Sequence, residues 1–61
     1  MDVASDFVPG QRVRLPAMPD WGIGQVQSVI GDRVTVNFEH AGKVTLRLSG
    51  VELEVVEDGR G

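Results

Sequence analysis

Residues 21–48 decide the fold, and they read W-G-I-G-Q-V-Q-S-V-I-G-D-R-V-T-V-N-F-E-H-A-G-K-V-T-L-R-L. Their cleanest alternation lies in residues 33–38, where Val34, Val36 and Phe38 are apolar and the residues between them are polar. Successive side chains of a strand point to opposite faces, so this pattern indicates a strand with one buried face. Residues 33–38 are therefore the first strand that we predict.

Strands are also expected on both sides of this one. Residues 43–48 repeat the alternation, with apolar side chains at every second position. Gly31-Asp32 has the length and composition of a two-residue hairpin turn, and residues 39–42 form a second tight connection. Together with residues 22–30, these segments predict an antiparallel meander of three strands.

The strand expected over residues 22–30 is less regular than its neighbours. We expect Ile23 and Val26 to point inward, and Val29 to do so only if the strand bulges or bends. Gly24 favours such a bend, because a glycine inside a strand is unfavourable unless the backbone coils sharply or approaches another strand closely. The sequence thus predicts an irregular second strand.

Shorter elements complete the chain. We predict a strand over residues 11–15, a proline-bounded loop over 16–20, a single helical turn at 49–51 and a last strand near residues 52–55. Five short strands with one apolar face favour an all-β fold, a small five-stranded SH3/Tudor-like barrel, because closure removes exposed sheet edges. An open three-stranded sheet is the main alternative. The expected boundaries are an N-terminal tail at 1–7, the barrel at 8–56 and a C-terminal tail at 57–61.

Composition limits the chemistry and the compartment. The chain has no cysteine and a single histidine, so it offers neither a disulfide nor a thiolate metal site. The lack of cysteine favours a reducing cytoplasm. Runs of apolar side chains do not exceed two residues, which predicts a soluble protein with no membrane span or signal-peptide core.

Charge is unevenly distributed along the chain. The formal net charge is −3, yet residues 11–48 carry five basic and three acidic residues, and the two ends are acidic. Nonspecific nucleic-acid binders usually have a basic balance, because Lys and Arg displace counterions from phosphates. The acidic ends argue against bulk attraction to DNA.

A pattern that covers nearly all of the expected barrel resembles known bacterial proteins. It consists of Gly10-x-x-Val13, Trp21-Gly22-x-Gly24-x-Val26, Val34-x-Val36-x-Phe38 and Lys43-x-x-Leu46-x-Leu48-Ser49-x-x-x-Leu53. The chain resembles a family of short bacterial SH3/Tudor-like proteins of unknown function. More distantly, it is similar to the C-terminal Tudor-like domain of UvrD/PcrA helicases and to the CarD and Mfd polymerase-interacting domains. That resemblance implies a protein partner in transcription or repair, with RNA polymerase as the first candidate.

The residues expected to bind a partner are one aromatic and a set of basic side chains. Trp21 follows the proline-bounded loop, and tryptophan is enriched in binding hot spots. The alternative for Trp21 is a structural role, closing one end of the barrel over Ile23 and Phe38. The basic set lies at outward strand positions and comprises Arg12, Arg14, Arg33, Lys43 and Arg47. Its alternative role is that of solvated charges that discourage edge pairing.

The sequence offers no catalytic, cofactor-binding or metal-binding set. His40 is expected to be an exposed turn residue, and no base adjoins Ser28 or Ser49. We therefore predict a noncatalytic protein-interaction module. The alternatives are a nucleic-acid-binding barrel that uses the Arg/Lys strand face, and a self-associating protein whose edge strands pair between copies. The expected state is a monomer or a weak homo-oligomer without cofactor or membrane contact.

Overall fold

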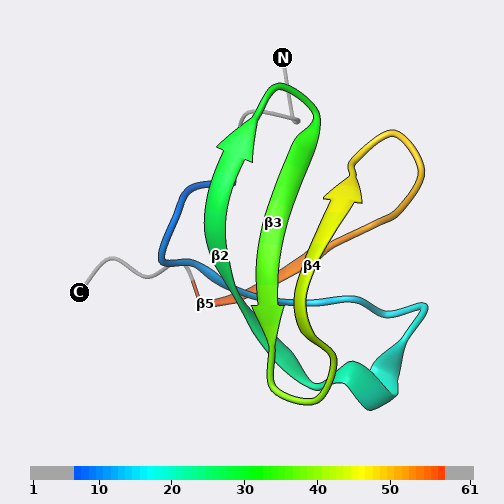
Figure 1. Cartoon of the computed structure of the whole chain (residues 1–61). Coiled ribbons are helices and arrows are strands. Elements are labelled where there is room, and N and C mark those ends of the chain that lie inside the picture. The colour runs from blue at the N-terminus through cyan, green and yellow to red at the C-terminus, as the bar shows by residue number, and fades with distance from the viewer. Residues whose placement is uncertain (1–6, 58–61) are drawn as a thin grey trace.

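The computed structural model describes residues 7–57, which form one antiparallel five-stranded sheet (Figure 1). The elements in chain order are β1 (Arg12–Arg14), the 3-10 helix η2 (Pro19–Trp21), β2 (Ile23–Ile30), β3 (Arg33–Phe38), β4 (Gly42–Arg47) and β5 (Glu54–Glu57). Their order across the sheet is β4-β3-β2-β1-β5. The all-β prediction and the β2-β3-β4 meander are confirmed.

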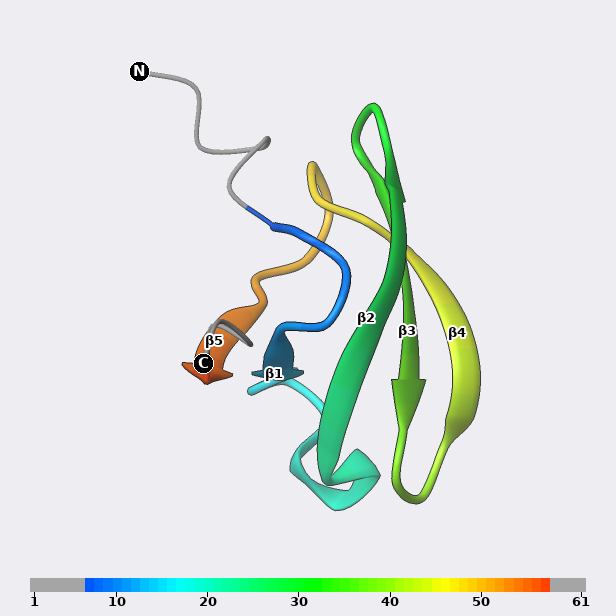
Figure 2. The same cartoon turned by 90° about the vertical axis from the view of Figure 1, so that its left-hand side faces the viewer.

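The sheet is strongly curved but not closed. In Figure 2, β1 and β5 lie on one side of the molecule and β2, β3 and β4 on the other. Within the described part of the chain, β4 and β5 are the two ends of the sheet order and are not hydrogen-bonded neighbours. The five strands are thus established, and closure into a barrel stays a prediction.

The strands of the second hairpin match the alternation closely. β3 has the predicted ends, and its Val34, Val36 and Phe38 are at most 2% exposed. β4 begins and ends one residue earlier than predicted, which leaves Leu48 in the following turn. Leu46 is buried and Val44 is half-buried, so the expected inward face is present.

A β-bulge explains the irregular pattern of β2. Val26 lies opposite Val36, but Ser28 lies opposite Thr35, so the register shifts between these pairs. One extra residue in the bulge changes which positions face inward, and Val29 consequently lies opposite the buried Val34. Val29 faces inward through a bulge, as the sequence allowed, but the bulge follows Val26 and does not lie at Gly24, where the bend was expected.

The prediction that Ile23 points inward is wrong. Ile23 lies opposite Arg14, an exposed residue of β1, so both side chains belong to the outer face. The inward position next to it is Gly24, which is buried opposite Phe38. Inward-facing residues of a strand are two positions apart, so the inward neighbour of Val26 is Gly24 and not Ile23.

Gly24 brings the backbone of β2 close to two core side chains of β3. A Cβ atom at this position would collide with Cγ1 of Val36 and lie 2.8 Å from Cδ1 of Phe38. The glycine thus leaves space for two side chains of β3. This is the close strand approach that justifies a glycine inside a strand.

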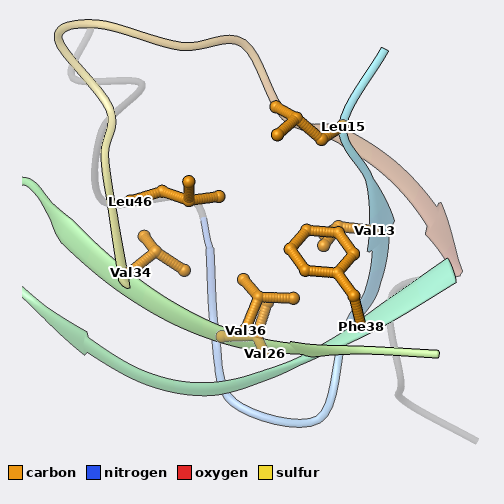
Figure 3. Packing of buried hydrophobic residues seen from close by; sticks show 7 residues of the cluster. All are labelled: Val13, Leu15, Val26, Val34, Val36, Phe38 and Leu46. Atoms are coloured by element: carbon orange, nitrogen blue, oxygen red, sulfur yellow. The ribbon is translucent and has the colours of Figure 1, made fainter. Parts of the chain in front are cut away.

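The core lies between the curved meander and the layer of β1 (Figure 3). Side chains from β3 point toward Leu15 and Leu46, while Val13 approaches the Phe38 ring. The fully packed set comprises Val13, Leu15, Val26, Val34, Val36, Phe38 and Leu46. Burial of these side chains removes apolar surface from water and is the main term that favours the fold.

The segments around the core differ from the prediction in detail. β1 is shorter than residues 11–15, and the loop at 16–20 leads into η2. Residues 48–50 form a hydrogen-bonded turn, with the amide of Gly50 donating to the carbonyl of Arg47 at 3.0 Å, and not a helix.

The first and last residues that the structure describes are Phe7 and Glu57. Phe7, assigned to the tail, packs partly buried against the core, and Glu57 is the last residue of β5. Val55 lies opposite Val13 on the inner face but is 46% exposed, because β5 is an edge strand. The tail predictions for residues 1–6 and 58–61 lie outside the described residues.

Candidate protein-docking surface

The outer face of the sheet carries cross-strand rows of polar side chains, and one row ends in a pair of arginines. Arg33 of β3 lies directly opposite Arg47 of β4, and Ile30 of β2 lies opposite Arg33 on its other side. Residues that are directly opposite share a face and have Cβ atoms about 4.5–5.5 Å apart. Ile30, Arg33 and Arg47 therefore form one contiguous surface, which we call the Ile30 patch.

Hydrogen bonds hold this patch in place. The amide of Leu48 donates to the carbonyl of Asp32 at 2.8 Å, which ties the end of β4 to the turn between β2 and β3. That turn has Gly31 at φ +60°, the backbone required at the first central residue of a type II′ hairpin. The arginines consequently project from strand ends and not from a free loop.

The two arginines of the patch lack an acidic partner in the described part of the chain. Among residues 7–57, Arg33 and Arg47 make no ion pair with an acidic side chain. Like charges directly opposite each other on neighbouring strands repel and destabilise the sheet. With respect to residues 7–57, the patch is thus a site of uncompensated positive charge.

Arg14 has the opposite environment at the other end of the outer face. Its Nε donates to Oε1 of Glu54 at 2.6 Å, which joins β1 to β5. Both side chains are about half exposed, at 55% and 54%, so water screens the pair. The interaction nevertheless occupies the charge of Arg14, which is less available to a partner than that of Arg33 or Arg47.

Replacing arginine by glutamine is expected to have opposite effects on stability at the two ends of the outer face. Arg47→Gln is expected to raise the free energy of unfolding by about 0.2–0.5 kcal/mol, because it removes the repulsion with Arg33. Arg14→Gln should lower it by about 0.2–1 kcal/mol, because it removes the ion pair with Glu54. Urea denaturation at low salt measures both changes, and added salt should shrink them. A loss of stability in Arg47→Gln would show that Arg33 and Arg47 do not repel.

Lys43 and Arg12 belong to a second row. Lys43 lies opposite Asn37, Asn37 opposite Gln25, and Gln25 opposite Arg12, so the row crosses four strands. An open groove of about 410 Å³ follows much of this row. It is lined by Arg12, Ile23, Gly24, Gln25, Asn37, Phe38, Glu39 and Gly42. The row offers mainly amide and cationic hydrogen-bonding groups.

Trp21 closes one end of the core. Its ring meets Phe38 edge to face, with centroids 5.2 Å apart and planes at 63°. The carbonyl of Trp21 accepts from the amide of His40 at 3.0 Å, which joins η2 to the turn after β3. Trp21 is half-buried, so the predicted contact with Phe38 is confirmed and part of the ring stays accessible. Its role in partner binding stays a prediction.

Glu39 and His40 serve the local structure of this end. The Oε1 of Glu39 accepts from the amide of Ile23 at 3.2 Å, and the amide of Glu39 donates to the carbonyl of Ile23 at 3.0 Å. His40 is exposed in the turn, as predicted.

No cluster of three potential metal ligands occurs within residues 7–57. In that same range, no helix is long and apolar enough to cross a membrane.

The structure brings together only part of the predicted basic face. Arg33 and Arg47 adjoin each other, Lys43 and Arg12 lie at opposite ends of another row, and Arg14 contacts Glu54. Sequence reasoning missed Ile30, which is 74% exposed and adjoins Arg33. The bulge was the available signal, because a strand that turns Val29 inward must turn Ile30 outward.

Comparison with known proteins shows to which family the chain belongs. No curated protein and no solved structure shows a significant match to the chain. A family model described as "Protein of unknown function (DUF3553)" matches residues 7–56, which is most of the chain. The chain therefore belongs to the DUF3553 family of proteins of unknown function.

Proposed function

We propose that this chain is a noncatalytic protein-interaction module that docks on a larger protein. The observation that carries the proposal is the position of β4 at the end of the sheet order, with basic side chains on its outer face. An edge strand has one row of backbone donors and acceptors without a strand partner, and an extended segment of another protein can pair with it. Strand addition at β4 is thus the binding mode that we propose.

The charges of β4 select the partner segment. Lys43 and Arg47 are outward on β4, and neither β3 nor β4 contains an acidic residue. At the opposite edge, β5 begins and ends with glutamate. A segment that pairs with β4 is therefore favoured if it carries Asp or Glu at alternate positions.

RNA polymerase and DNA-repair assemblies are the first candidate partners, because the sequence pattern resembles polymerase-interacting Tudor-like domains.

The lack of cysteine favours a cytoplasmic location. The residue types support a noncatalytic role, since the chain has no cysteine and its single histidine is exposed in a turn.

Nucleic-acid binding is the second candidate function. The uncompensated Arg33–Arg47 pair favours an anionic ligand, and phosphate oxygens are such ligands. Exposed aromatic rings that would stack on bases are missing from the described outer face, because Phe7, Trp21 and Phe38 all pack on the core. Protein carboxylates therefore rank before phosphates.

A crosslinked pulldown of the tagged protein from bacterial lysate tests the proposal. We expect polymerase or repair subunits to be enriched after nuclease treatment. We also expect recovery to fall several-fold in Lys43→Glu, because the new carboxylate repels an acidic segment beside β4. Trp21→Phe, which keeps an aromatic ring against Phe38, should retain more partner than Trp21→Ala if Trp21 takes part in binding.

Two results would contradict this assignment. Recovery that disappears with nuclease, together with an affinity that falls steeply with salt, would assign the face to nucleic acid. Equal recovery by wild type and Lys43→Glu, with both proteins folded by circular dichroism, would exclude β4 as the docking edge.

A further inference from the structure

Ile30 is the most exposed large apolar residue among residues 7–57, with 74% of its surface accessible. It stands at the end of β2, and its cross-strand neighbour on the outer face is Arg33. Single exposed apolar residues are common on protein surfaces. What distinguishes Ile30 is its place in a row with two guanidinium groups.

The electrostatic state of this row points to an external anion. Arg33 and Arg47 repel each other, and neither finds an acidic partner in residues 7–57. Asp32 lies in the adjacent turn, but it contributes its backbone carbonyl to Leu48 and makes no ion pair with either arginine. A ligand that places carboxylates between the arginines would relieve the repulsion and make charge-assisted hydrogen bonds.

We infer that the Ile30 patch binds an acidic protein segment in which an apolar side chain lies next to carboxylates. The apolar side chain packs on Ile30, and the carboxylates meet Arg33 and Arg47. Guanidinium groups suit this role because their planar fork matches the two oxygens of a carboxylate. This inference rests on the proposed protein-docking function and specifies the chemistry of the partner.

The patch favours protein over nucleic acid for two reasons. Isoleucine offers an aliphatic surface and no ring on which a base would stack. The chain as a whole has a net charge of −3, which opposes a long polyanion more than a short acidic segment. The patch thus combines local positive charge with a global charge that disfavours extended phosphate backbones.

The test uses synthetic probes and backbone amide NMR signals of the full chain. One peptide carries Glu-Leu-Glu in a Gly/Ser frame, a second carries Glu-Ser-Glu in the same frame, and a third probe is a thymidine oligonucleotide. We expect the Glu-Leu-Glu peptide to shift the signals of Ile30, Arg33 and Arg47 first. It should bind about threefold to tenfold more tightly than the Glu-Ser-Glu peptide, because only leucine buries apolar surface on Ile30.

Matched variants locate the binding site. Arg33→Gln with Arg47→Gln should weaken the Glu-Leu-Glu peptide about tenfold. Arg12→Gln with Arg14→Gln changes the net charge equally at the other end of the outer face and should weaken it less than about twofold. In Ile30→Ser, the preference for leucine over serine in the peptide should disappear. All variants change exposed residues, and their amide spectra verify the fold.

Several outcomes would overturn the inference. They are equal weakening by the two double variants, tighter binding of the oligonucleotide than of either peptide, and signal shifts away from the patch. Shifts at Ile30, Arg33 and Arg47 that depend on protein concentration alone would identify a second copy as the occupant. Lack of peptide binding together with nuclease-resistant, Lys43-dependent polymerase capture would remove the Ile30 patch and leave the proposed function standing.

Discussion

Phe38→Ala is expected to lower the free energy of unfolding by about 3–5 kcal/mol. Phe38 is 2% exposed, belongs to the packed core, and supports the ring of Trp21 at 5.2 Å. A chain of 61 residues has a total stability of about 3–9 kcal/mol, so the loss is a large fraction of it. Denaturant unfolding followed by the fluorescence of Trp21, the only tryptophan, should show a lower midpoint and an altered native spectrum.

Phe38→Leu is the control for this substitution. Leucine retains much of the buried volume but lacks the ring that meets Trp21, so we expect a smaller loss of stability with a similar change in fluorescence. A loss below about 1 kcal/mol in Phe38→Ala would mean that the ring is not a central part of the core.

Gly24→Ala is the second substitution with a large expected effect, a loss of about 1–3 kcal/mol. The added methyl group would collide with Cγ1 of Val36 and lie 2.8 Å and 2.9 Å from Cδ1 and Cε1 of Phe38. Because these atoms belong to buried side chains, the core must shift or the strands must separate. Thermal or chemical denaturation measures the loss.

Gly50→Ala is the matched control for Gly24→Ala. A Cβ atom at Gly50 would meet only the carbonyl oxygen of Arg47 at 3.9 Å, and Gly50 does not have a positive φ. We expect a change within about 0.5 kcal/mol, since no contact is strained and the unfolded chain loses some freedom. Similar destabilisation by both alanines would assign the effect to strand or turn propensity and not to the contact with Phe38.

The fold could be predicted where alternation alone determines the face of a strand. β3 was predicted with its observed ends because Val34, Val36 and Phe38 leave one choice of buried face. For β2 the sequence indicates an irregular strand with a bend at Gly24, whereas the bulge follows Val26. Ile23 is expected inward because a glycine is rarely recognised as a core position, but it lies on the outer face. The structure shows why Gly24 is a core position: Phe38 fills the space that a side chain at residue 24 would occupy.

The closure of the sheet and the exposure of its edge strand could not be predicted from the local sequence pattern. β5 pairs with β1 across about 40 residues of sequence, and its register shifts between Arg12 and Val13. The alternation near Val55 therefore predicts a strand but not its exposure, which depends on what covers the edge. Whether β4 and β5 meet is a property of sheet curvature, and no short segment encodes it.

The candidate site was predicted as residue types and not as an arrangement. The five basic residues are on strands, yet their environments differ because of cross-strand partners. Arg14 meets Glu54 only through the β1–β5 pairing, and Arg33 meets Arg47 only through the β3–β4 register. Charge counting treats these arginines alike, whereas register separates a neutralised one from a repelling pair.

The bulge of β2 also affects how this surface tolerates changes in chain length. Gln27 is the extra residue between the pairs Val26–Val36 and Ser28–Thr35. A chain without it would pair the same residues and keep Val29 inward and Ile30 outward, but it would lose the local bend. Deletion of Gln27 is therefore expected to change the angle between the two ends of the outer face, and hence the shape of partner that spans them, while the paired side chains on that face are retained.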